Sequence, residues 1–227
     1  MNAVRIRQFG LTEYEPVWHA MQDFTNRRTA DTGDEIWYTE HRPVFTLGVN
    51  TRPEHLLAPG DIPVVQVDRG GQVTYHGPGQ LMIYPLIDIR RAGVGVRALV
   101  TALEQSVVDL AAELGIAAAS RCDAPGVYVD GAKLASVGLR VRRGASFHGM
   151  ALNVAMDREP FTRINPCGFS GLAVTDLRQL GVGLTLDETH RRLTPHLLAR
   201  LGLTEAGPGP SSFEGGQHAL GDEAGQE

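Results

Sequence analysis

The chain has little lysine, little cysteine and no long apolar run. Lys and Arg together number 21 among 227 residues, and Lys133 is the only Lys. Cys122 and Cys167 are the only cysteines, and the absence of a CxxC pair excludes a zinc ribbon or a thioredoxin-type redox pair. No apolar run reaches the ~18 residues of a membrane span. No such run follows Arg5 and Arg7 either, so we expect no secretory signal, no membrane association and a cytoplasmic location.

Net charge is also small, and it arises at one end of the chain. The formal net charge is -5, and the five carboxylates of residues 204–227, a segment without Lys or Arg, account for all of it. A neutral remainder argues against a nucleic-acid binder, whose surface is usually basic. The apolar content of 42% is that of an ordinary globular protein. We therefore expect one domain over residues 1–203 and a disordered, acidic, Gly-rich tail over 204–227.

Residue spacing predicts a small number of helices and several strands. Apolar side chains recur at helical spacing in residues 12–28, 96–114 and 187–201, and Thr12 with Glu15 resembles a capping box for the first of these helices. Extended apolar segments are expected at 35–47, 62–67, 81–89, 127–129, 132–142 and 145–154. The strands first alternate with helices and then form hairpins. This order predicts an α+β (α/β) fold with a mixed, largely antiparallel sheet and packed helices.

The last expected hairpin places the single lysine on an apolar face. Asp130-Gly131 and Arg143-Gly144 are both suited to two-residue turns. The second turn would oppose Leu139 to His148 and Lys133 to Val154, so that Lys133 and His148 share a face. Burial on that face would lower the pKa of Lys133. The alternative is an edge Lys that extends its ammonium group to water.

Two short segments have the composition of a ligand site. Arg69–Gln80 holds four Gly and one Pro in twelve residues, which bars a helix and lets backbone approach a ligand. It lacks the Gly-Lys-Ser/Thr of a phosphate loop and the Gly spacing of a dinucleotide fingerprint, so a ligand loop and a tight hairpin both stay open. In Ile164–Gly168 a Pro and a Gly flank Cys167, a setting that suits an exposed nucleophile. Cys122 has no comparable setting.

Four motifs together resemble the lipoyl(octanoyl) transferase family, over roughly residues 45–176. The motifs are Arg69–Gln80, Ala124–Tyr128, Ser146–Gly149 and Arg163–Gly168. The resemblance implies a biotin/lipoate protein ligase-like fold. It also implies transfer of an octanoyl group from octanoyl-acyl carrier protein to a lysine of lipoyl domains. Those acceptors would be the lipoyl domains of 2-oxoacid dehydrogenase complexes and the H protein of glycine cleavage.

The same resemblance assigns roles to individual residues. It implies that Cys167 is the acyl-thioester nucleophile and that Lys133 lowers its pKa. No metal or cofactor is implied, because the thioester donor is already activated. The implied acyl pocket consists of three segments: Arg69, Gly70, Gly71, Gln72, Val73, Thr74, Tyr75 and His76; Ser136, Val137 and Gly138; and His148, Gly149, Met150 and Ala151.

Two other functions stay open on the sequence. A lipoate–protein ligase would share the fold and a Lys in the corresponding strand, but it would need ATP and no Cys. A non-catalytic module that binds acylated carrier domains would need neither Cys167 nor Lys133 as reactive groups. A test for ATP dependence distinguishes the ligase from the transferase. A turnover assay distinguishes the non-catalytic module from an enzyme. A papain-like hydrolase is disfavoured, because nothing here resembles its Cys-containing helix start.

Overall fold

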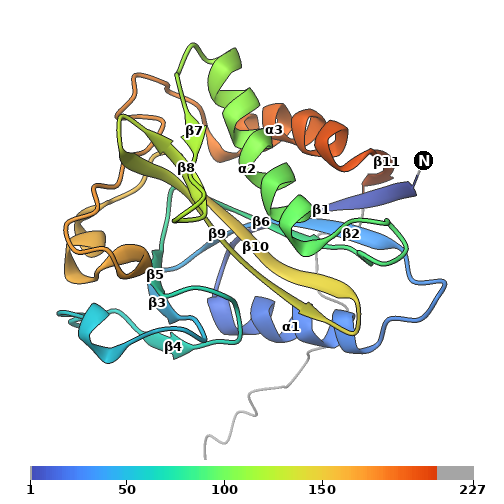
Figure 1. The fold of residues 1–227 in the computed structure, drawn as a ribbon, viewed down its shortest axis with the longest axis horizontal. Helices are drawn as coiled ribbons and strands as arrows, with labels where there is room; N and C mark the ends of the chain where they lie inside the picture. Colours follow the sequence, from blue (N-terminus) through green and yellow to red (C-terminus); the bar gives the residue numbers. More distant parts are fainter. Residues whose placement is uncertain (1, 209–227) are drawn as a thin grey trace, which may run out of the picture.

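Two sheets form the frame of the molecule in the computed structural model, which describes residues 2–208 (Figure 1). Eight strands form a sheet in the order β11-β1-β2-β6-β10-β9-β8-β7, and three form a second sheet in the order β4-β3-β5. In the large sheet β1 is parallel to β2 and β11, and the remaining neighbours are antiparallel. The predicted α+β class with a mixed, largely antiparallel sheet is confirmed.

The elements follow one another along the chain with short connections. The strands are β1 (Asn2–Thr12), β2 (Asp34–His41), β3 (Val44–Leu47), β4 (Val64–Gln66), β5 (Val73–His76), β6 (Gln80–Leu86), β7 (Ala119–Ser120), β8 (Gly126–Val129), β9 (Ala132–Arg142), β10 (Ala145–Asn153) and β11 (Leu203–Pro208). The helices are α1 (Tyr14–Asn26), α2 (Val96–Glu113) and α3 (Leu186–Leu201), with short 3₁₀ turns η1 (Pro53–His55), η2 (Glu159–Arg163) and η3 (Pro166–Gly168). Within residues 2–208 no helix combines the length and apolar character needed to cross a membrane.

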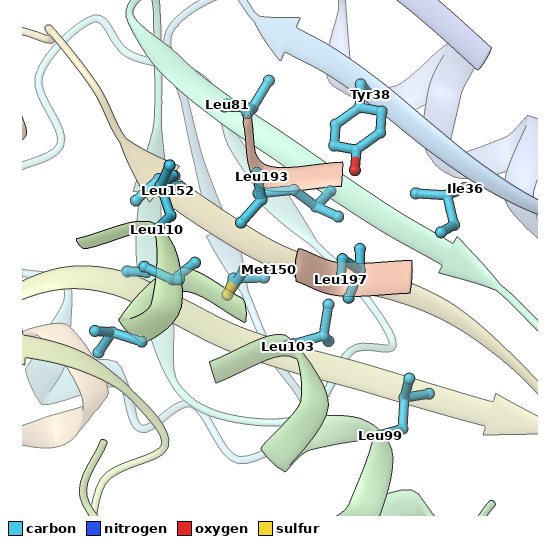
Figure 2. Packing of buried hydrophobic residues seen from close by; sticks show 14 of the residues in the cluster. Ile36, Tyr38, Leu81, Leu99, Leu103, Leu110, Met150, Leu152, Leu193 and Leu197 are labelled. Carbon is cyan, nitrogen blue, oxygen red and sulfur yellow. The ribbon is translucent and has the colours of Figure 1, made fainter. Parts of the chain in front are cut away.

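Helices cover both faces of the large sheet. On one face the apolar stripes of α2 and α3 pack on the central strands and form the main core (Figure 2). On the other face α1 packs over β2, β6 and β10 and forms a second, smaller core. The main core includes Leu99, Leu103 and Leu110 of α2, Leu193 and Leu197 of α3, and Met150 and Leu152 of β10. Each fully buried side chain of this kind stabilises the fold by about 2 kcal/mol.

The helix predictions are confirmed in position, but one cap is wrong. α1 begins at Tyr14, and Thr12 belongs to β1. The Thr12 hydroxyl lies 2.9 Å from the Thr39 hydroxyl and 3.1 Å from His41 Nδ1, so it serves the pairing of β1 with β2 and not a helix end. Among the described helices a capping box lies at α3, where Thr185 and Glu188 satisfy each other's backbone N–H groups.

Both predicted hairpin turns are present. φ is 48° and 81° at Asp130-Gly131 and 53° and 86° at Arg143-Gly144, as two-residue turns with two left-handed positions require. Arg142 therefore pairs with Ala145 and Leu139 with His148, as predicted.

The predicted pairing of Lys133 with Val154 is wrong. β10 ends at Asn153. The Lys133 N–H donates to the carbonyl oxygen of Ala173 at 2.8 Å, and its carbonyl oxygen accepts from the N–H of Thr175 at 3.0 Å. A later segment of the chain thus takes the place expected for the end of β10.

The chain stays in the sheet beyond residue 203. Residues 204–208, expected to belong to a disordered tail, form most of β11 and pair in parallel with β1, with Thr204 opposite Ala3. Backbone pairing holds this segment although its composition is that of a loop. Residues 209–227, the remainder of the expected tail, lie outside the described residues.

Candidate active site

Lys133 lies in β9 of the large sheet, and its side chain is buried. Its side chain is 1% exposed, its Nζ donates to the carbonyl oxygen of Pro125 at 3.2 Å, and it lies 5.1 Å from the ring centre of Tyr128. A cation over an aromatic face is attracted by the ring's quadrupole. The expected burial is confirmed, and an ammonium group extended to water is excluded.

A glycine and a carboxyl group complete the surroundings of Lys133. A Cβ at Gly126 would collide with the carbonyl oxygen of Ala135 and lie 3.3 Å from Lys133 Cε, and φ is 141°. The Gly126 N–H donates to Glu104 Oε1 at 2.6 Å. Burial raises the pKa of Glu104, while this hydrogen bond and the charge of Lys133 lower it. Glu104 was not predicted from the sequence, although a carboxyl group beside the apolar stripe of residues 96–114 indicated it.

The turn that carries Cys167 is joined to Lys133 through the main chain that follows it. Cys167 lies in η3, which packs against β5. A Cβ on Gly168, the next residue, would lie 3.6 Å from Gln72 Cγ. The chain then returns to Ala173 and Thr175, which are hydrogen-bonded to both sides of the Lys133 backbone. Lys133 and the turn of Cys167, 34 positions apart in the sequence, therefore belong to one connected part of the fold.

A pocket lies between the two sheets, and the predicted segments form most of its wall. It holds about 480 Å³ not filled by protein atoms, part of it open to solvent. Tyr14, Met82 and Tyr84 complete the lining and were not predicted. The predicted residues that line it are Arg69, Gly71, Gln72, Val73, Thr74, His76, Ser136, Val137, Gly138, His148, Gly149, Met150 and Ala151.

Gly70 and Tyr75, also expected in the pocket, do not line it. Gly70 lies at the outer edge of the loop, where its N–H donates to the Leu139 carbonyl oxygen at 3.0 Å. Tyr75 points away by strand alternation and packs against Phe45 and Phe161, with ring centres 5.5 Å apart in both pairs.

Arg69 is a buried part of the pocket wall and makes hydrogen bonds to backbone and hydroxyl oxygens. Its Nη2 donates to the Thr46 carbonyl oxygen at 2.7 Å and to the Thr46 hydroxyl at 2.8 Å, and its Nη1 donates to the Gly70 carbonyl oxygen at 3.0 Å. The guanidinium group thus fixes the glycine-rich loop against β3.

His148 points into this pocket and not toward the core beneath α2, so its predicted face is wrong. Its φ of 57° interrupts the alternation of β10, and Phe147 and His148 both lie on the α1 side. His148 Nε2 lies 2.8 Å from Asp68 Oδ1, and Nδ1 lies 3.5 Å from the Tyr14 hydroxyl. Because an ionised carboxylate only accepts, the proton is on Nε2.

Burial and hydrogen bonding set the ionisation of this pair. Burial lowers the pKa of His148, and the neighbouring Asp68 opposes this. Burial would raise the pKa of Asp68, but hydrogen bonds from His148, Trp18 and Gln22 hold it at about 2. Asp68 is a site residue that the sequence analysis missed, although it directly precedes the glycine-rich loop.

Tyr14, His76 and Tyr84 line the pocket, and His41, which does not line it, contacts Tyr84. His41 Nε2 lies 2.8 Å from the Tyr84 hydroxyl, and burial lowers the pKa of His41 to about 4. His76 stacks on Tyr14 with ring centres 5.5 Å apart, and burial lowers its pKa well below the ordinary value. A largely uncharged pocket of this kind suits an apolar chain with a few polar contacts.

Comparisons with known proteins agree on one family. The family described as lipoyl protein ligase A/B catalytic domain matches residues 13–198. The chain is 59% identical to the octanoyltransferase of Stutzerimonas stutzeri over 202 residues, covering 89% of this chain and 92% of that protein. It is 56% identical to the octanoyltransferase of Shewanella halifaxensis, again over 89% of this chain and 92% of the relative.

Solved structures agree with this chain in fold. A putative lipoate protein ligase from T. acidophilum with bound lipoic acid has a TM-score of 0.70 at 15% identity, covering 91% of this chain and 89% of that one. A biotin protein ligase from Aquifex aeolicus has a TM-score of 0.53 at 12% identity, covering 89% and 70%. The expected ligase-like fold is confirmed.

Proposed function

Because the chain belongs to the lipoyl protein ligase A/B catalytic domain family, we propose that it acts through an acyl-enzyme on Cys167 and takes its acyl group from an acyl carrier protein. It is an octanoyltransferase, as its 56–59% identity to proteins of that name over most of their length indicates. Its acceptors are lipoyl domains. The acceptors that we propose are the lipoyl domains of 2-oxoacid dehydrogenase complexes and the H protein of glycine cleavage. We propose that the reaction takes place in the cytoplasm.

The first half-reaction forms the acyl-enzyme. The Cys167 thiolate attacks the carbonyl carbon of the donor thioester, and a new C–S bond forms as the bond to the carrier's thiol breaks. The carrier leaves as a thiolate and takes up the proton that the Lys133 ammonium group gives up, which leaves Lys133 neutral. Lys133 supports this step because a nearby ammonium group favours the thiolate over the thiol.

The second half-reaction transfers the acyl group to nitrogen. The acceptor's lysine amine attacks the acyl-enzyme, a C–N bond forms, and the C–S bond to Cys167 breaks. Lys133, neutral at this stage, accepts the proton that the attacking amine loses. Two sequential substitutions on one nucleophile predict ping-pong kinetics.

The observation that best supports this assignment is that hydrogen bonds connect Lys133 to the segment that follows the Cys167 turn. The buried Lys133 is hydrogen-bonded through its main chain to the segment that follows Cys167, and Gly168 borders the pocket residue Gln72. The pocket would hold the octanoyl chain. The identity to octanoyltransferases far exceeds the 14% shared with a lipoate-protein ligase solved with ATP, so the transferase is preferred to a ligase.

Intact-mass measurement tests the proposal. After mixing with octanoyl-acyl carrier protein, the wild-type protein should gain the mass of one octanoyl group. Cys167→Ala should show no adduct and no transfer to a lipoyl domain. Cys122→Ala is the matched control, because Cys122 is an exposed free cysteine, and it should keep both. An adduct that persists on Cys167→Ala would refute the assignment.

A further inference from the structure

A second hollow lies beside the turn that carries Cys167. It encloses about 1090 Å³, part of it open to solvent. Asn165 and Pro166, which directly precede Cys167, form part of its wall, and so do Ala173 and Val174, which adjoin the Lys133 backbone. We refer to this hollow as the outer groove.

The outer groove borders this turn directly, and the acyl pocket is linked to it through Gln72. They have no lining residue in common. On the pocket side Gly168 lies against Gln72, whereas on the groove side Pro166 forms the wall. The turn that carries Cys167 is therefore close to two separate spaces, and a substrate bound there can extend into both.

A thioester substrate has two arms that diverge from its carbonyl carbon. If the acyl chain fills the pocket, the sulfur and the group attached to it must extend elsewhere. In an acyl carrier protein that group is a pantetheine arm, an extended chain with two amides, methylene groups and a branched dimethyl carbon. We propose that the outer groove binds this arm, an inference that rests on the proposed function.

The wall of the outer groove has the mixed chemistry that such an arm needs. Leu57 is 54% exposed at its edge, and Phe161 and Val174 add further apolar surface. Covering a large exposed apolar side chain is favourable, because apolar area is removed from water. Asn165, Thr162 and Ser170 supply groups that can hydrogen-bond the amides.

The outer groove also continues along the surface. A third hollow of about 1190 Å³ shares Arg158 and Glu159 with the outer groove and extends past Tyr75 to Arg178. An extended arm can therefore lie along the surface while its carrier domain stays outside. A short thioester without an arm would use the acyl pocket alone.

The test compares a donor with the arm to a donor without it. Octanoyl-pantetheine and the octanoyl thioester of ethanethiol are mixed with the protein, and acyl-enzyme formation is followed by rapid quench and intact mass. Ser170→Trp and Thr162→Trp each fill the groove from an exposed position on a different part of its wall. Ala117→Trp, exposed in the connection between α2 and β7, is the matched control.

We expect the preference for octanoyl-pantetheine over the short thioester to fall about tenfold in both groove variants. Ala117→Trp should keep the wild-type preference. An unchanged preference in the groove variants would overturn the inference. Normal acylation with slow transfer to a lipoyl domain would indicate that the groove binds the acceptor. This outcome would also overturn the inference. A wild-type protein that forms no adduct with any donor would refute the proposed function itself.

Discussion

The ammonium group of Lys133 donates to the carbonyl oxygen of Pro125 at 3.2 Å. This bond links the only lysine to the Ala124–Tyr128 motif, whose role was not evident from local rules. Gly126, the next residue, leaves room for the Lys133 side chain, because a Cβ there would lie 3.3 Å from Lys133 Cε, a tight contact. The motif therefore positions the Lys133 side chain: Pro125 accepts a hydrogen bond from the ammonium group, and Gly126 leaves space for the methylene chain.

The first prediction concerns the type of cation at position 133. Lys133→Arg keeps a positive charge, but a guanidinium group is bulkier and does not accept a proton near neutral pH. We expect transfer to a lipoyl domain to slow by about 100-fold, the usual scale of a lost proton-transfer group. Steady-state transfer and a thermal melt measure activity and folding together. Near-normal turnover of a folded variant would show that Lys133 does not take part in proton transfer.

The second prediction concerns the reactivity of Cys167. Lys133→Ala removes the ammonium group that would favour the thiolate. In a Cys122→Ala background, iodoacetamide should therefore alkylate Cys167 about tenfold more slowly at pH 7, as one pKa unit implies. An unchanged rate would show that Lys133 does not act on the thiol.

The third prediction concerns the close contact of β10 with β6. A Cβ at Gly149 would overlap the Ile83 carbonyl oxygen and come within 2.7 Å of Pro85 Cδ. Because backbone cannot move aside as a flexible side chain does, Gly149→Ala should lower the free energy of unfolding by about 3 kcal/mol. Gly183→Ala, with nothing within 4 Å of the added carbon, is the control and should change it by less than about 0.5 kcal/mol. Urea unfolding measures both.

The fourth prediction concerns acid stability. The folded state lowers the pKa of His41 from 6.5 to about 4 by burial. Between these values the unfolded chain binds more protons at this site than the folded one, so stability rises with pH and is lost as pH falls. His41 alone should cost about 3 kcal/mol between pH 7 and pH 4.

Urea unfolding across that range checks this loss. His41→Gln should show a shallower dependence on pH than the wild type, whatever its stability at pH 7. His19→Gln replaces an exposed histidine and should keep the wild-type slope. Equal slopes in all three proteins would contradict the assignment to His41.

The fifth prediction concerns docking of acidic carrier domains. Arg140, Arg142 and Arg143 are exposed on the β9–β10 hairpin, and the adjacent Leu139 accepts from Gly70 of the pocket loop. Reversing Arg142 and Arg143 to Glu should raise the KM for octanoyl-acyl carrier protein about fivefold, with a strong dependence on salt. The rate with a short octanoyl thioester should change little. Equal losses with both donors would indicate damage to the fold and not to docking.

Local patterns in the sequence were enough for several elements. The apolar stripe of residues 96–114 predicted α2, which spans Val96–Glu113. The two hairpin turns followed from dipeptides that tolerate left-handed backbone, and the register of β9 with β10 followed from the second turn. Such features depend on residues that are neighbours in sequence. β1 was missed, although Val4 and Ile6 alternate with Arg5 and Arg7 in the pattern of a half-buried strand.

The motifs that resemble a family identified the pocket segments but not their arrangement. Asp68, Glu104 and Tyr14 were not recognised as parts of the site, since each acts through a partner distant in sequence: His148, Gly126 and His76. No spacing rule reports such contacts, because long-range packing decides them.

The sequence by itself determined which residue types are rare and reactive, where the turns lie and how the last hairpin is paired. Tertiary structure decided how these parts face one another. The left-handed backbone at His148 turned its ring toward Asp68 and away from the α2 core. The segment after Cys167 took the pairing partner of Lys133 that local alternation had assigned to Val154. In both cases a hydrogen bond between distant segments prevailed over alternation, because a buried polar group must find a partner wherever the fold supplies one.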